Sequence, residues 1–84
     1  MNAVNKQATD QYLLLQGRQF ALDLVDSFGD RLYSAKGVAD AISRLAVASQ
    51  NKPGSYALGI NNVVDVLKKG LEEMTPSALV NSHD

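Results

Sequence analysis

The sequence predicts an all-α fold, a small three-helix bundle, and three observations support this prediction. Apolar residues recur at helical spacing in three segments, with polar residues on the opposite side of each segment. The chain is 45% hydrophobic and 20% charged, a composition typical of folded proteins. A chain of 84 residues has room for one hydrophobic core. We therefore expect residues 1–84 to form a single helical domain, with residues 1–8 and 81–84 as flexible ends.

The first expected helix is long and begins near Thr9 or Asp10, because either side chain can cap the free N–H groups of a first turn. Its apolar stripe extends over about five turns and consists of Leu13, Phe20, Ala21, Leu24, Val25, Phe28 and Leu32. Gly29 lies near its end, where a glycine costs about 1 kcal/mol relative to alanine and can mark a kink or a terminus. The sequence leaves open whether the helix breaks at Gly29 or continues into the second helix.

The second expected helix covers residues 36–49, and Ser34 is its candidate N-cap. Its narrow apolar stripe consists of Val38, Ala41, Ile42, Leu45 and Ala48. Asp40 and Arg44 are four residues apart in the favourable order, so we expect them to form an ion pair along the helix.

A turn at Pro53-Gly54 separates the second helix from the third. Pro53 suits the first central position of a β-turn, and Gly54 can supply the positive φ of the second. Ser55 then caps a third helix over residues 55–74, which forms an antiparallel hairpin with the second. Pro76 ends this helix, and a short C-terminal turn can begin there.

The third helix contains two glycines, Gly59 and Gly70, on one line with Val63 and Val66. This line is displaced from the main apolar stripe that begins at Tyr56, so the helix is apolar on two adjacent faces. Each glycine costs about 1 kcal/mol inside a helix, which favours a close crossing by another helix. The alternative is that both glycines lie near the helix ends, where they cost little. We expect these five residues to form the surface for a partner or for self-association.

Residues 31–52 carry Arg31, Lys36, Arg44 and Lys52 against Asp40 alone, a local charge of four minus one, or +3, in a chain of net charge −1. Such a segment can bind an anionic ligand or nucleic acid, although spread basic residues are more often simply solvated. A helix-turn-helix motif joins its helices by three or four residues, whereas this connector has about six. Nucleic acid is therefore the weaker alternative.

The residues that usually carry catalysis are sparse. The chain has no cysteine, and its one histidine, His83, is next to the C-terminal residue of the sequence. Asp23, Asp26 and Asp30 share one helix stripe, which we interpret as a solvated acidic face because no calcium loop surrounds them. No phosphate-binding glycine motif is present. We expect no enzymatic activity, no metal and no cofactor.

The function that the sequence favours is a non-enzymatic helical protein–protein interaction module, such as a small adaptor, inhibitor or regulatory accessory protein of bacteria or phage. It would act through an apolar helix face and self-associate as a homodimer or a higher oligomer. No apolar run reaches the length of a membrane span and no secretory signal is recognisable, so we expect a cytoplasmic protein without membrane partners. The alternative is a regulator that binds DNA or an anionic ligand through residues 31–52.

Overall fold

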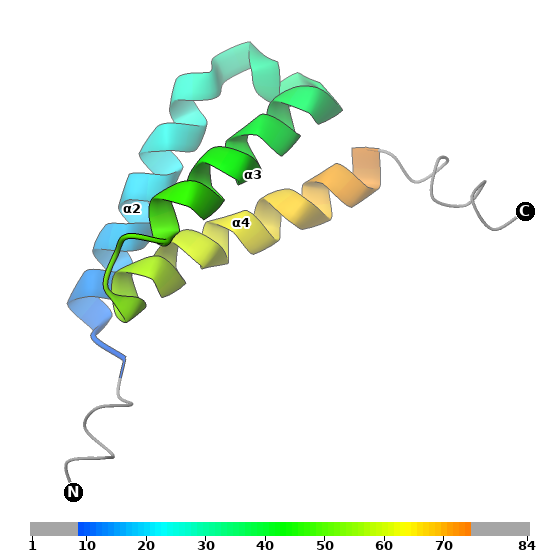
Figure 1. Ribbon diagram of the computed structural model, residues 1–84. Coiled ribbons are helices and arrows are strands. Elements are labelled where there is room, and N and C mark those ends of the chain that lie inside the picture. Colours follow the sequence, from blue (N-terminus) through cyan, green and yellow to red (C-terminus); the bar gives the residue numbers. More distant parts are fainter. Residues whose placement is uncertain (1–8, 75–84) are drawn as a thin grey trace, which may run out of the picture.

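A computed structural model describes residues 9–74 and shows a small three-helix bundle (Figure 1). The elements are α2 (Gln11–Phe28), the 3-10 helix η1 (Gly29–Tyr33), α3 (Ala35–Ser49) and α4 (Gly54–Met74). The chain runs along α2, reverses through η1, returns along α3 and reverses again into α4 (Figure 1). The predicted all-α class is confirmed. The expected flexible ends and the C-terminal turn lie outside the described residues.

The boundaries of α2 follow from one cap and one glycine. Asp10 is the N-cap, and its carboxylate accepts a hydrogen bond of 3.2 Å from the Leu13 N–H, as one of the two predicted alternatives required. The helix ends at Phe28 because Gly29 has φ 55° and ψ −128°, a conformation that disfavours residues with a Cβ. The helix therefore breaks at Gly29, and η1 leads into α3.

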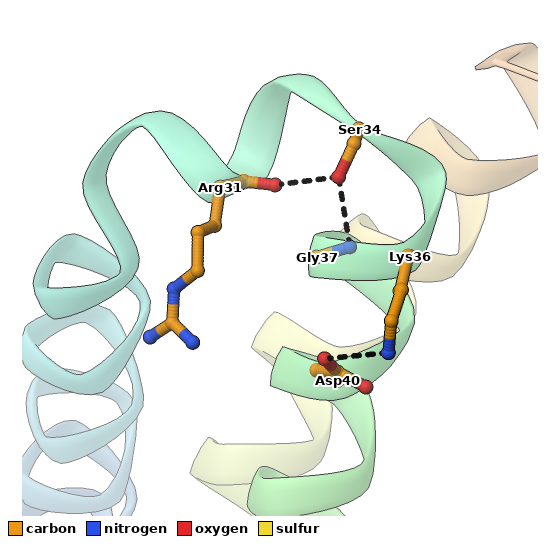
Figure 2. Close-up of polar contacts among 5 residues, drawn as sticks. All are labelled: Arg31, Ser34, Lys36, Gly37 and Asp40. Carbon is orange, nitrogen blue, oxygen red and sulfur yellow. Dashed lines mark hydrogen bonds and ion pairs between the residues drawn. The ribbon is translucent and has the colours of Figure 1, made fainter.

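Ser34 caps α3, as predicted. Its hydroxyl oxygen accepts the Gly37 N–H at 3.0 Å and donates to the Arg31 carbonyl at 3.1 Å (Figure 2). A Cβ atom on Gly37 would collide with that same carbonyl group, so the end of η1 lies directly against the first turn of α3. These contacts fix the angle between the two elements.

The prediction that Asp40 forms an ion pair with Arg44 is wrong. Asp40 pairs with Lys36 at 3.7 Å, one turn earlier in α3 (Figure 2). The guanidinium of Arg44 lies over the Phe28 ring instead, 5.9 Å from its centroid. An aromatic ring and a carboxylate can both attract a cation, and here Arg44 lies over the Phe28 ring of α2.

The turn between α3 and α4 differs from the prediction. Gly54 is the first residue of α4 and not a turn residue with positive φ, since Gly29 alone has positive φ among residues 9–74. The Pro53 carbonyl accepts the Ala57 N–H at 2.8 Å, so helical hydrogen bonding starts at the proline itself. Ser55 is not the N-cap of α4, because it is the second residue of the helix, and its hydroxyl accepts the Asp10 N–H at 2.9 Å. A contact with the start of α2 thus replaces the local cap.

The core lies where the three helices meet, and α4 packs extensively on both α2 and α3. Its central cluster consists of Ala21, Leu45, Ile60, Val63 and Val64. The α2–α4 contact is the larger of the two, so α2 is the principal partner of α4 and does more than cover the α3–α4 hairpin. None of the helices in residues 9–74 combines the length and the apolar composition that a membrane span requires.

Candidate functional site

Two glycines set how closely α2 and α4 approach each other. A Cβ atom on Gly17 would collide with the Tyr56 carbonyl, and one on Gly59 would collide with the Leu14 carbonyl and the Arg18 nitrogen. Only the missing side chains allow the two backbones to touch at this crossing. The turns that follow the crossing on each helix therefore lie side by side.

A groove opens between α2 and α4 immediately beyond this crossing. It has a volume of about 310 Å³ and is lined by Arg18, Leu22, Asn62, Val63 and Val66. Val63 is buried, whereas 68% of Val66 and 47% of Leu22 are exposed to solvent. The groove thus has an apolar floor and two apolar walls, with a guanidinium and an amide as its polar groups.

Two further apolar residues of the same helices, outside the lining of the groove, are exposed. Leu15 lies two turns before Leu22 on α2 and is 55% exposed, and Leu58 on α4 is also exposed. Single exposed apolar residues are ordinary, but a cluster around a groove marks an interaction surface more often than chance. We refer to Leu15, Leu22, Leu58, Val63 and Val66 as the α2–α4 face.

The five residues predicted for self-association occupy different environments. Gly59 and Val63 are buried and Tyr56 is half-buried, and all three contribute to the packing of the chain's own helices. Val66 is exposed in the groove, and Gly70 is half-buried with nothing within 4 Å of an added Cβ. The close crossing expected at Gly59 exists, and its partner is α2 of the same chain.

Tyr56 also borders a second hollow, of about 370 Å³, on the other side of the α2–α4 crossing. Its ring lies 6.1 Å from that of Phe20, and the Lys52 ammonium is 5.3 Å from the Tyr56 ring centroid and 5.7 Å from the Phe20 centroid. Asp23 accepts a hydrogen bond of 2.9 Å from Gln19 at its edge. These polar groups already have partners, and the hollow is wide and shallow.

The four basic residues predicted as an anion site do not form one cluster. Arg31 and Arg44 meet at Phe28, with guanidinium carbons 4.1 Å and 5.9 Å from the ring centroid. In Figure 2 the Arg31 side chain extends toward α2, whereas Lys36 lies on Asp40 of its own helix. Lys52 lies at the opposite end of α3, over Tyr56. The structure thus brings two of the four residues together.

The charged side chains of residues 9–74 are all exposed. No polar or charged side chain is buried among residues 9–74, and no three potential metal ligands gather there. Asp23, Asp26 and Asp30 are all exposed. His83 lies outside the described residues. What the described surface offers is apolar area with a polar edge.

Sequence reasoning did not single out Arg18, Leu22 or Asn62. Leu15 and Leu22 are seven residues apart and therefore share a face of α2, displaced from the main apolar stripe. That second stripe is the signal that could have revealed the α2 side of the groove. Gly17, in the interior of a strongly periodic helix, could have revealed the crossing by the same argument that identified Gly59.

Comparison of the chain with protein-family models, with curated proteins and with solved structures found no match.

Proposed function

We propose that this chain is a non-enzymatic helical protein–protein interaction module that binds its partners through the α2–α4 face. The observation that carries the proposal is the groove itself, in which Val66 and Leu22 are 68% and 47% exposed beside the buried Val63. An apolar side chain left in water on either wall gains about 25 cal/mol for each Å² that a partner covers. A partner that inserts an apolar helix or side chain between α2 and α4 covers the exposed Leu22 and Val66 at the same time.

The polar edge of the groove would give such a partner its orientation. Arg18 is exposed on the α2 side, and Asn62 lies on the α4 side. A guanidinium donates in a fixed fork, and an amide both donates and accepts, so the two groups can select one binding direction. The proposal fits a small adaptor, inhibitor or regulatory accessory protein, acting in the cytoplasm on another protein and on its own copies.

The test is affinity capture from a nuclease-treated lysate of the native host, with three baits. The wild type is compared with Val66→Asp, which places a charge in the groove, and with Val47→Asp as matched control. Val47 is 61% exposed on α3, so the same substitution is made on a helix surface outside the groove. We expect the partner to be retained by wild type and Val47→Asp and lost with Val66→Asp. Equal capture by all three baits would contradict the proposal.

A second candidate function is the binding of DNA or an anionic ligand, and one observation favours it. Arg31 of η1 and Arg44 of α3 converge on Phe28, which orients two guanidinium groups from different elements toward the same region. If this site binds a polyanion, changing Arg31 and Arg44 to Ala abolishes binding, and wild-type binding weakens steeply with salt. Binding to a nucleic acid without salt dependence would remove this candidate.

A further inference from the structure

Two exposed charges on α2 flank Leu22 at equal distances along the helix. Arg18 lies one turn before Leu22 on α2 and Asp26 one turn after it, and both are exposed. The two charges are about 12 Å apart along the helix, too far for an ion pair with each other. Within residues 9–74, the ion pair present is Lys36–Asp40, so Arg18 and Asp26 both lack a partner of opposite charge there.

We propose that a second copy of this chain covers the groove, related to the first by a two-fold axis that passes beside Leu22 and Val66. This inference rests on the proposed function, since it names the partner of the same face. An axis that passes beside both residues lies in the interface and runs across α2 and α4, so it reverses the direction of each helix and α2 faces its copy in antiparallel orientation. Leu22 then meets Leu22 of the second copy, and Val66 meets Val66.

This register pairs Arg18 with Asp26. Position 18 is four residues before position 22, and position 26 is four residues after it, so Arg18 of each copy faces Asp26 of the other. Because the interface is isologous, the pair forms twice, once at each end of the apolar contact. Any other protein would have to present the opposite charges at the same spacing, whereas a second copy supplies both by symmetry.

The α4 side accommodates the same arrangement. Asn62 is four residues before Val66 and Gly70 is four residues after it. Asn62 of each copy therefore faces Gly70 of the other copy across the axis. Nothing lies within 4 Å of a Cβ atom built on Gly70, which leaves room for an amide side chain from the second copy. The register thus brings no two like charges together at Leu22 or Val66.

The first test measures the mass of the full chain by sedimentation velocity from about 1 µM to about 1 mM. This range covers the dissociation constants of weak to moderate dimers. We expect a concentration-dependent dimer for the wild type and for Val47→Asp. Val66→Asp should raise the dissociation constant by at least about tenfold, because the introduced carboxylate would face its copy across the axis. Circular dichroism of each variant establishes that it remains helical.

The second test examines the register and does not depend on the apolar contact. Arg18→Asp and Asp26→Arg each place two like charges opposite one another, so each variant alone should dimerise about tenfold more weakly. Mixing the two variants restores both opposite-charge pairs, because the acidic chain faces the basic chain at each position. We expect the mixture to form heterodimers with a dissociation constant within about threefold of the wild type.

A wild type that stays monomeric over this range would overturn the inference, as would a dimer that is indifferent to Val66→Asp. A mixture that associates no more tightly than its separate components would overturn the antiparallel register. None of these results decides the proposed function, because that proposal stands or falls on the Val66-dependent capture of another protein. A monomeric chain that still captures a partner through Val66 would retain the function and lose the second copy.

Discussion

Gly59 of α4 lies against the carbonyl group of Leu14 in α2, so closely that a Cβ atom at position 59 would collide with it. Gly17 has the same relationship to the Tyr56 carbonyl, in the opposite direction across the crossing. The two contacts determine the position of α2 relative to α4, and hence the width of the groove beyond them. Gly59, which the sequence suggested for an intermolecular contact, thus belongs to the packing within the chain that forms the groove.

Replacing either crossing glycine should destabilise the protein. We expect Gly59→Ala and Gly17→Ala each to lower the free energy of unfolding by about 2–3 kcal/mol, because the neighbours are rigid backbone atoms that must move apart. Gly70→Ala is the matched control, since its Cβ would meet nothing within 4 Å. It should raise stability by about 0.5–1 kcal/mol through helix propensity. Urea denaturation measures all three, and a stabilised Gly59→Ala would refute the crossing.

Gly29 should be intolerant of a side chain for a different reason. It has nothing within 4 Å of an added Cβ, but its φ of 55° with ψ −128° is strained for any other residue. We expect Gly29→Ala to cost about 1–3 kcal/mol in the free energy of unfolding. Gly54→Ala, equally free of neighbours but in helical backbone, should be neutral or stabilising. Equal effects of the two substitutions in thermal or urea unfolding would contradict this explanation.

The sequence predicted well those features of the fold that depend on neighbours along the chain. Asp10, one of two candidates, and Ser34 could be named as caps because a cap bonds to an N–H three residues later. Gly29 was a candidate break because glycine is costly inside a helix. Ser55 was misassigned because α4 begins one residue earlier, at Gly54; its hydroxyl bonds instead to Asp10, 45 residues away, a partner that spacing cannot reveal. The same holds for Arg44, which Phe28 draws away from Asp40.

The candidate site was only partly predictable for the same physical reason. Val66 could be identified as surplus apolar surface on the third helix, since the periodicity of one helix is visible in the sequence. Leu22 forms the other wall of the groove. The crossing at Gly17 and Gly59 determines which face of α2 lies beside Val66. That crossing is a contact between distant segments.

Loss of the Ser34 hydroxyl should loosen the connection between η1 and α3. The hydroxyl satisfies the Gly37 N–H and bonds to the Arg31 carbonyl, so Ser34→Ala should cost about 1 kcal/mol in the free energy of unfolding. Ser34→Asp should retain most of this stability, because a carboxylate also caps. Ser49→Ala is the control, since that hydroxyl donates only to the Ala46 carbonyl of its own helix. An unchanged Ser34→Ala midpoint in urea would contradict the role of the cap.

The core should depend strongly on Leu45, which is fully buried and packs with residues of both neighbouring helices. We expect Leu45→Ala to lower the free energy of unfolding by about 2–5 kcal/mol, the range for a large aliphatic side chain truncated in a core. Val47→Ala, two residues away and 61% exposed, should change stability by less than about 0.5 kcal/mol. Chemical denaturation distinguishes the two, and comparable losses would mean that α3 packs through a different face.

The most direct measurement of the central claim, that a second copy of this chain covers the α2–α4 face, is methyl NMR of the wild-type chain over a dilution series. The methyl groups of Leu22 and Val66 lie on that face, and those of Val47 lie on α3 away from it. We predict that the Leu22 and Val66 signals shift with concentration while the Val47 signals stay fixed. Signals of Leu22 and Val66 that do not change with concentration, or a shift confined to Val47, would contradict it.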